Sequence, residues 1–447
     1  MVTFVQLSTR TPARLRMDLL AAASAAVLVA VAFAVPRLAG EEFRRTLYAG
    51  SAPIFGIWLP HIGWGTGPAI LIAVLVVRYG PEFAARQPWS RLPGLAYVTS
   101  LGWTFALAMV DGWQRGFVGR LLDRNEYLRE VGGVTDIPAM LRGFSGRILD
   151  FQPDSWTTHV SGHPPGALLF FVLLDRVGPG GGAWAGAACM FLGCSVVPAI
   201  LVALHALGVE HRARAALPYL VLAPAAIWIA VSADAVFAGV TAWALALLAR
   251  ATRESAWGTT AVGAGVLFGL GVYLNYGLIL MAIPALILLC ARRAVWPLLP
   301  MLAGALAVAA VFTMAGFWWL DGYHLVVQRY YQGIASERPF SYWWWGNLAA
   351  AVCAVGAAAI GGVPRALSPK MLRALDPAAL LVAGCLVAIL VADASGLSKA
   401  ETERIWLPFT VWIIVAAGFL PRRAARAWLA VQAVGALALV HLLLTNW

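Results

Sequence analysis

Runs of roughly 17 to 25 apolar residues recur along the whole chain, and each is long enough to cross a hydrocarbon core of about 30 Å. Apolar residues make up 61% of the chain and charged residues 12%, against about 25% charged residues in a soluble domain. We therefore predict an all-α polytopic membrane protein of about thirteen transmembrane helices. The runs lie at about 18–36, 52–78, 93–112, 183–207, 215–231, 235–250, 258–274, 277–291, 296–317, 342–362, 377–392, 404–421 and 427–445.

The formal charge of +11 is carried almost entirely by arginine, because Lys370 and Lys399 are the only lysines. Most of these arginines gather in short segments that flank the apolar runs, which is the positive-inside pattern of a multi-pass plasma-membrane protein and not a phosphate-binding groove. We expect no nucleic-acid partner and a cytoplasmic N-terminus. The segments expected in the cytoplasm contain Arg10, Arg14 and Arg16; Arg78, Arg86 and Arg91; Arg212 and Arg214; Arg250 and Arg253; Arg292 and Arg293; Arg365, Lys370 and Arg373; and Arg422, Arg423 and Arg426.

With this orientation the long polar stretch from Gln114 to about His163 lies outside the cell. Residues 166–177 are too short to span comfortably, so we predict a partial or interfacial helix there; three tilted crossings in this part of the chain are the alternative. The five cysteines lie inside apolar runs without a CxxC spacing, which favours packing roles over a disulfide or zinc site. We expect no cofactor and no metal.

Ionisable residues collect on the predicted outer face, where the membrane meets the extracytoplasmic space. Such groups are costly within or beside a membrane and are functional candidates for that reason. A face of this kind could hold an amphiphile, with its polar head at the charged groups and its tail between helices. The residues are Asp111, Asp123, Glu126, Asp136, Asp150, Asp154, His159, His163, Asp234, Asp321, His324, Lys399, Glu401, Glu403 and Arg404.

Two segments of the outer loop form an ordered pair: Asp123-Arg-Asn-Glu126-Tyr127, then Ser161-Gly-His163-Pro-Pro-Gly166. The pair resembles the acidic motif and the Lys/His-Pro-Pro motif of GT-C glycosyltransferases, which use polyprenyl-phosphate sugars. The resemblance implies a GT-C-like bundle whose extracytoplasmic loop carries juxtamembrane helices. It also implies a polyprenyl-phosphate-linked sugar donor.

Glycosyl transfer to a hydroxyl requires a carboxylate to take the proton as the anomeric carbon leaves phosphate. Glu126 is the expected base, because it stands directly before Tyr127 as in the family pattern. Asp123 is the second candidate, since the adjacent acidic pair of many members is split here. Tyr127 is expected to contact substrate. The competing interpretation of Glu126 is a solvated loop acid.

His159 and His163 are four residues apart, but Gly162, Pro164 and Pro165 argue against a helix that would make them a metal pair. We expect each histidine to contact a phosphate or a sugar. A structural role in the loop is the alternative, because the Pro-Pro pair stiffens the chain regardless of what His163 does.

Asp234 lies in the outer turn Ser232-Ala-Asp234, which is similar to a Thr-Asp turn of many GT-C proteins. An acid here could orient a sugar hydroxyl or a loop cation. It could also serve as the N-cap of a helix that starts near Ala235, and the two roles are compatible.

A late segment, Lys399-Ala-Glu-Thr-Glu403-Arg404-Ile-Trp-Leu-Pro408-Phe409, resembles a stretch of actinobacterial membrane glycosyltransferases. Arg404 can bind phosphate through two hydrogen bonds, and Lys399 adds a point charge. We expect both to hold the donor phosphate, with Glu403 contacting substrate. A local Glu–Arg ion pair is the alternative.

The predicted outer loop 321–342 contains Arg329, a further candidate for the donor phosphate, and the aromatic stretch Tyr342-Trp-Trp-Trp345. Aromatic side chains pack against sugar faces, and this stretch is similar to members of the same family. An ordinary interfacial aromatic belt is the alternative.

The resemblance covers most of residues 100–447 and departs in two places. Residues 1–92 resemble a transmembrane hairpin added to a catalytic domain at 93–447, whose external loop is 113–165. The outer turn at Asn275 lacks the lysine of many relatives.

The predicted function is transfer of mannose or arabinofuranose from the polyprenyl-phosphate donor to a glycan or glycolipid acceptor of the cell envelope. A lipid or glycan transporter or flippase is the alternative, although we find no convincing internal repeat. A membrane hydrolase is disfavoured, since no GxSxG or HExxH motif occurs. A non-enzymatic assembly factor remains a further alternative.

Overall fold

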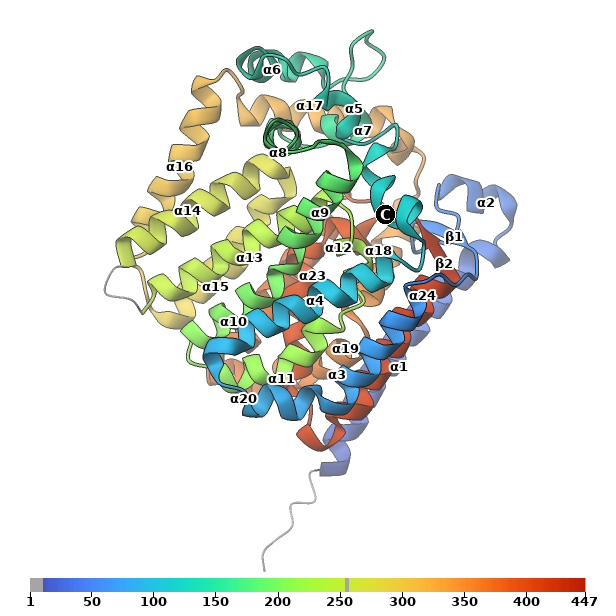
Figure 1. The fold of residues 1–447 in the computed structure, drawn as a ribbon, viewed down its shortest axis with the longest axis vertical. Coiled ribbons are helices and arrows are strands. Elements are labelled where there is room, and N and C mark those ends of the chain that lie inside the picture. Colours follow the sequence, from blue (N-terminus) through green and yellow to red (C-terminus); the bar gives the residue numbers. More distant parts are fainter. Residues whose placement is uncertain (1–10, 254–256, 447) are drawn as a thin grey trace, which may run out of the picture.

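Helices make up nearly all of the structure, a computed structural model that describes residues 11–253 and 257–446. The predicted all-α architecture is confirmed (Figure 1). Two three-residue strands, β1 (Gly56–Trp58) and β2 (Leu443–Thr445), pair antiparallel and join the N-terminal part of the chain to its C-terminal end. Arg10 lies outside the described residues.

The α-helices follow one another with short connections. In chain order they are α1 (Thr11–Leu38), α2 (Glu41–Thr46), α3 (Thr66–Arg86), α4 (Leu92–Ala108), α5 (Leu128–Val131), α6 (Ile137–Gly143), α7 (Thr158–Ser161), α8 (Pro165–Val177), α9 (Gly181–Cys194), α10 (Val196–Ala206), α11 (Glu210–Val221), α12 (Ala226–Ile229), α13 (Ala233–Ala251), α14 (Trp257–Leu274), α15 (Ala282–Arg292), α16 (Leu298–Met314), α17 (Trp319–Gln332), α18 (Phe340–Val355), α19 (Ala357–Ala366), α20 (Pro369–Arg373), α21 (Pro377–Ala394), α22 (Thr402–Ile405), α23 (Leu407–Ile413) and α24 (Ala425–Leu442). Single turns of other helix types include η2 (Gln114–Val118), η3 (Arg120–Leu122), η5 (Tyr276–Met281) and η7 (Ile414–Phe419).

Six helices in the described chain are long and apolar enough to cross a membrane, and eight if each of two bent pairs is one span. The chain is a multi-pass membrane protein. The prediction of about thirteen crossings took each apolar run as one transmembrane helix. In the structure several of these runs form shorter helices, or pairs of helices that meet at a bend. One such run is α18 with α19, which meet at 101°. Gly356 between them has φ +88°, a left-handed conformation that disfavours other residues.

Three expected segments differ from the structure. The run at 52–78 is not one helix: residues 47–65 contain Pro53, Gly56 and Pro60, which disfavour helix, and α3 begins only at Thr66. The loop expected at 321–342 is instead largely the helix α17, bent by 75° from α16. The run at 215–231 is divided into α11 and α12 near Pro224. By contrast, the partial helix expected at 166–177 is present as the 13-residue α8.

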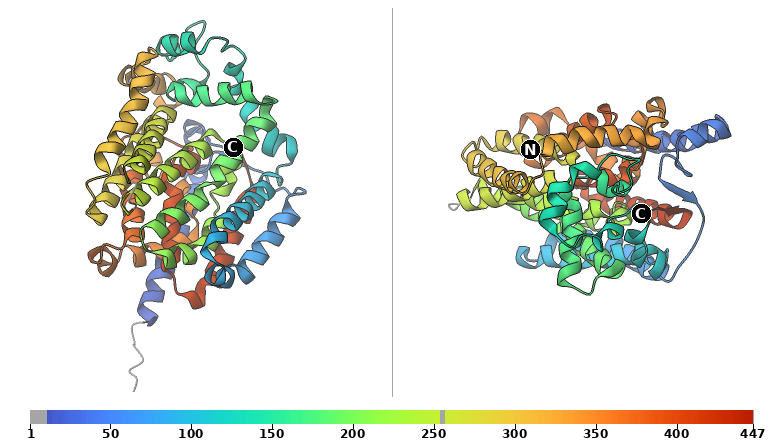
Figure 2. Two further views of the ribbon diagram at one scale, coloured as in Figure 1. Left: turned by 60° about the vertical axis from the view of Figure 1, so that its left-hand side comes forward. Right: turned by 90° about the horizontal axis from the view of Figure 1, so that it is seen from above.

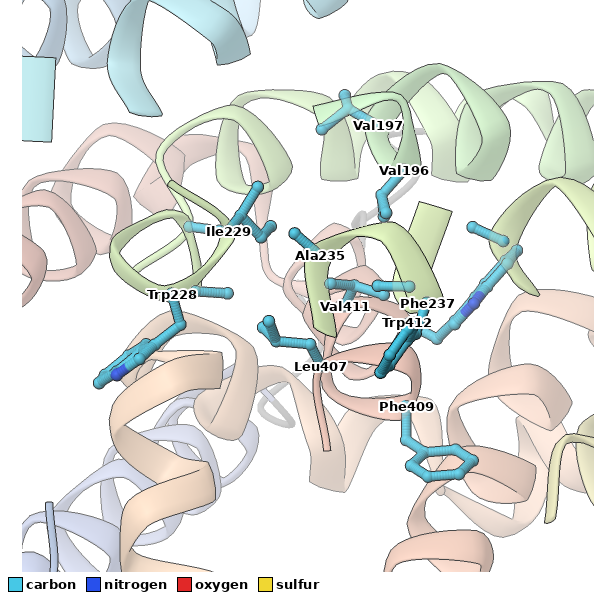
Figure 3. Packing of buried hydrophobic residues seen from close by; sticks show 14 of the residues in the cluster. Val196, Val197, Trp228, Ile229, Ala235, Phe237, Leu407, Phe409, Val411 and Trp412 are labelled. Atoms are coloured by element: carbon cyan, nitrogen blue, oxygen red, sulfur yellow. The ribbon is translucent and has the colours of Figure 1, made fainter. Parts of the chain in front are cut away.

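The core forms where α13 packs against α9, α10 and α23. Figure 3 shows Ala235 and Phe237 of α13 next to Val411 and Trp412 of α23. Trp412 of α23 is fully buried there. Small residues allow the closest approach elsewhere, between α14 and α16: a Cβ on Gly265 would lie 1.9 Å from the Met301 carbonyl oxygen. These packed helices form the support for the polar segments at one end.

The first 92 residues pack against helices throughout the rest of the chain. Helix α1 contacts α18 and α19, and the guanidinium of Arg365 on α19 binds the buried Asp18 carboxylate of α1 through hydrogen bonds of 2.7 to 2.9 Å. Helix α3 packs against α4, α11 and α24. The division into a transmembrane hairpin at 1–92 and a catalytic domain at 93–447 stays a prediction.

The polar outer segments of the sequence lie at one end of the molecule. Figures 1 and 2 show α5, α6, α7 and α17 together at this end, with α20 at the opposite one. We call the first the loop end. This arrangement agrees with the parity of the apolar runs, which places 114–163 and 321–342 on one side and 365–373 on the other.

A labelling experiment tests which end faces the outside. In a Cys290→Ser background, because Cys290 is exposed, a cysteine at the exposed Gln152 is expected to react with an impermeant maleimide in intact cells. A cysteine at the exposed Lys370 is expected to react only after permeabilisation, since basic loops stay in the cytoplasm. Labelling in intact cells at position 370 but not at position 152 would show that the predicted orientation is wrong and that the loop end faces the cytoplasm.

Candidate active site

A cavity of about 1160 Å³ opens at the loop end. Its polar wall is formed by residues of the 115–125 segment, α7 and α22, and its apolar wall by η5, α17, α21 and α23. Five of the ten predicted site residues line the cavity and five do not. Those that line it are Asp123, His159, His163, Arg329 and Arg404; those that do not are Glu126, Tyr127, Asp234, Lys399 and Glu403.

Arg404 is the centre of a buried charge network. Its Nη1 donates to Asp234 Oδ2 at 2.5 Å and its Nη2 to Glu401 Oε2 at 2.5 Å. Burial by itself lowers the pKa of Arg404, but the carboxylates of Asp234, Glu401 and Glu126 outweigh burial and raise it. Arg404 is therefore a permanent cation that joins α13 to α22 at the cavity wall.

The two interpretations of Asp234 can now be separated. The N-cap of α13 is Ser232, whose hydroxyl accepts a hydrogen bond from the Ala235 amide at 3.3 Å. The cap role assigned to Asp234 is therefore wrong, because the residue two positions earlier occupies the cap. Asp234 is 1% exposed and binds Arg404, as expected for an acid that orients a cation.

Glu126 does not line the cavity and lies next to His159, which does. The carboxylate is 3% exposed, and its Oε1 lies 2.9 Å from His159 Nδ1. The other ring nitrogen of His159, Nε2, lies 3.3 Å from Arg404 Nη2. Since an arginine has no acceptor, His159 Nε2 accepts and Nδ1 carries the proton toward Glu126. The order Glu126–His159–Arg404 thus connects the acidic motif of the loop to the late Glu-x-x-Arg segment.

Asp123 is the acid of the motif that faces the cavity. It is exposed, and its Oδ1 accepts hydrogen bonds from the Asn125 amide at 3.0 Å and the Asn125 side chain at 3.1 Å. This local turn holds the carboxylate at the cavity wall and leaves Oδ2 for another partner.

Tyr127 and His163 form a second layer. The His163 Nδ1 donates to the His159 carbonyl oxygen at 2.7 Å and lies 2.9 Å from the Tyr127 hydroxyl. Burial lowers the pKa of His163 to about 4, so the ring is neutral near pH 7. His163 can therefore contact a ligand as a neutral ring and not as a cation, while Tyr127 is 2% exposed and supports it from behind.

The other two predicted phosphate ligands are engaged elsewhere. Arg329 lines the cavity, pairs with Asp150 and donates to the Ser161 hydroxyl at 3.2 Å. Lys399 does not line the cavity; its ammonium donates to the Ala335 carbonyl oxygen at 2.9 Å.

Glu403 is fully buried, and its Oε1 accepts a hydrogen bond from the Phe55 amide at 2.9 Å. Burial raises its pKa to about 7. Glu403 thus secures the irregular 47–65 segment, and it is Phe55 from this segment that reaches the cavity.

Sequence reasoning missed several residues of the cavity wall. Phe55 was placed inside a transmembrane run, and Asn446 at the C-terminal end was not considered. The local Glu–Arg ion pair given as the alternative for the Lys399–Phe409 segment is present between Glu401 and Arg404, which are three residues apart. Arg115, Arg120 and Arg124 also line the cavity and were not among the predicted site residues.

Two solved structures are similar to this chain. The chain matches ArnT from Cupriavidus metallidurans in the apo state, with 19% identity, a TM-score of 0.45, and coverage of 74% of this chain and 59% of that one. It also matches the Archaeoglobus fulgidus oligosaccharyltransferase tethered to an acceptor peptide, with 10% identity, a TM-score of 0.42, and coverage of 74% and 49%. The chain thus spans about half of each structure's length. No family model and no curated protein matches it.

Proposed function

We propose that this protein is a membrane glycosyltransferase that moves a sugar from a polyprenyl-phosphate donor to a glycan or glycolipid acceptor. The supporting observation is that one cavity collects the acidic-loop segment, the His-Pro-Pro segment and the late Glu-x-x-Arg segment. These are the three stretches that resemble GT-C motifs. Mannose and arabinofuranose are the proposed sugars, and the site is proposed to face the extracytoplasmic side of the plasma membrane.

The walls of the cavity suit an amphiphilic donor. Apolar side chains of η5, α21 and α23, including Leu278, Val391 and Phe409, line one part of it. Arg404 and Arg329 line another. A prenyl chain along the apolar wall would bring its phosphate to the guanidinium groups, which bind phosphate oxygens through paired hydrogen bonds.

The proposed reaction is a single displacement. The acceptor hydroxyl attacks the anomeric carbon, the bond from that carbon to the phosphate oxygen breaks, and polyprenyl phosphate leaves with the bonding electrons. The acceptor proton goes to a carboxylate, either directly to Asp123 or to Glu126 through His159. In the second route His159 Nε2 gives up its hydrogen bond from Arg404 and takes the acceptor proton, while Nδ1 passes its own proton to Glu126. Arg404 stabilises the charge that develops on the leaving phosphate.

A transfer assay tests this function against a transporter. The full chain in liposomes is expected to release polyprenyl phosphate from polyprenyl-phosphate mannose or arabinofuranose when a cell-envelope extract supplies the acceptor, with label entering the glycan fraction. Movement of intact donor between leaflets without bond cleavage would instead identify a flippase. Liposomes with Glu126→Gln protein serve as the control, because this variant keeps the size of the side chain but lacks the proposed base.

A further inference from the structure

A second group of cations faces the cavity from the loop that follows α4. Arg115 of η2, Arg120 of η3 and Arg124 all line it. We call these three residues the arginine wall. They are distinct from Arg404 and Arg329, which reach the cavity from α22 and α17.

Two members of the arginine wall have no protein partner. Arg115 and Arg124 are exposed side chains, and within the described part of the chain neither donates a hydrogen bond nor joins an ion pair. Arg404 and Arg329, by contrast, are each bound to a carboxylate. Within the described residues, the guanidinium groups of Arg115 and Arg124 are therefore uncommitted donors at the cavity.

The third member is rigidly held. Arg120 donates to Asp111 Oδ2 at 2.5 Å and to the Thr445 carbonyl oxygen at 2.6 Å. Asp111 is held in turn by His61 Nε2 at 2.7 Å. The Nε of Arg120 is buried and has no hydrogen-bond partner among the described residues. The bonds to Asp111 and Thr445 fix the guanidinium of Arg120, so it contributes a positive charge of fixed position to the wall.

The balance of guanidinium and carboxylate groups differs between the two sides of the cavity. Around Arg404 and Arg338 stand the three carboxylates of Glu126, Asp234 and Glu401, so acids outnumber guanidinium groups there. The arginine wall has three guanidinium groups against two carboxylates, Asp111 and Asp123. The arginine wall thus retains positive charge for an anion of its own, separate from the proposed donor phosphate at Arg404 and Arg329.

We propose that the arginine wall binds a phosphate group carried by the acceptor, separately from the phosphate of the donor. This inference rests on the proposed function and names its acceptor class: a phosphorylated glycan or a phospholipid-based glycolipid. The wall belongs to polar loop segments and lies beside Asn446, whereas the apolar lining that suits a prenyl chain comes from η5, α17, α21 and α23. Paired guanidinium groups match the charge and the oxygens of a phosphate monoester or diester.

Two probes separate the two phosphate sites in the full chain reconstituted in phosphatidylcholine nanodiscs. Inorganic phosphate reports the arginine wall, and farnesyl phosphate reports the donor site. Calorimetric titration is expected to show that inorganic phosphate still binds when farnesyl phosphate is saturating. Arg115→Gln combined with Arg124→Gln should weaken phosphate binding at least about tenfold, because two charge-assisted hydrogen-bonding groups are lost. Farnesyl phosphate affinity should remain within about twofold.

The matched control is Arg129→Gln combined with Arg142→Gln. Both residues are exposed in the same loop, neither lines the cavity, and the change in net charge is identical. This control should bind both probes as the unmodified protein does. Equal loss in the control and the test variant would show a general charge effect and overturn the proposal.

Competition identifies the role and source of the phosphate. If farnesyl phosphate displaces inorganic phosphate and the Arg115/Arg124 variant loses both, the wall is part of the donor site and the proposal is wrong. If inorganic phosphate binds but farnesyl phosphate does not bind at all, the proposed donor fails while the wall stands as an anion site. If the arginine wall binds a lipid headgroup, inorganic phosphate should no longer bind in nanodiscs enriched in phosphatidylglycerol. If it binds a glycan phosphate, inorganic phosphate should bind in these nanodiscs as before. Either result supports an anion site at the wall.

Discussion

Replacing Glu126 with glutamine is expected to slow sugar transfer at least about a hundredfold, the usual contribution of a positioned base. The amide keeps the size of the side chain and can still contact His159 Nδ1, 2.9 Å away in the native protein. It cannot accept a proton. Donor binding should therefore persist while turnover falls, measured as release of polyprenyl phosphate under saturating donor.

Two companion variants assign the role of Glu126. If the proton passes through the ring, His159→Asn should lower turnover as much as Glu126→Gln, because His159 stands between Glu126 and the cavity. Asp123→Asn should cost far less. Thermal stability in detergent should stay near that of the unmodified protein for a catalytic role and fall for a structural one.

The contrary results are equally specific. An inactive Asp123→Asn beside an active Glu126→Gln would move the base to Asp123, the motif acid that lines the cavity. Normal turnover in both variants would refute the enzyme class and favour the transporter.

Replacing Arg404 with glutamine is expected to produce the largest combined loss of stability and donor affinity. Arg404 is 6% exposed, and its removal leaves Asp234 buried without its cation and Glu401 paired with Arg338 alone. Breaking a buried pair in this way costs about 3 to 5 kcal/mol. The apparent unfolding midpoint should fall sharply.

A second substitution separates stability from binding. Arg404→Gln combined with Asp234→Asn removes the stranded charge and should recover part of the unfolding midpoint. Farnesyl phosphate binding should remain weak in the double variant if Arg404 holds the donor phosphate. Recovery of donor affinity together with stability would assign Arg404 a purely structural role.

Arg404→Lys tests the geometry of the same contact. Lysine keeps the charge but cannot reach Asp234, Glu401 and a phosphate together, because its ammonium is a single point. Donor affinity should fall well below that of the unmodified protein. The matched control is Arg426→Lys, whose exposed pair with Glu82 should tolerate the change.

The architecture of this protein could be predicted from local properties of the sequence. Apolar runs of sufficient length form helices in a membrane whatever their neighbours, because burying apolar side chains and satisfying backbone groups within the segment are both local requirements. The positions at which these apolar runs are interrupted or bent could not be predicted from the runs themselves. The 47–65 segment and the bend at Gly356 depend on packing against other helices, and α17 forms a helix where an outer loop was expected.

The candidate site shows the same division. Parity of the apolar runs was enough to predict that the acidic loop and the Arg404 segment lie at one end, and five of the ten predicted residues line one cavity there. The partners of each charge could not be predicted. Asp234 and Arg404 are 170 residues apart in sequence, and Lys399 and Glu403 turn to Ala335 and Phe55 instead of the cavity. A buried charge must find its counter-ion wherever the fold brings one within reach. The ion-pair partners, and the uncommitted state of Arg115 and Arg124, are therefore decided only when the helices have packed.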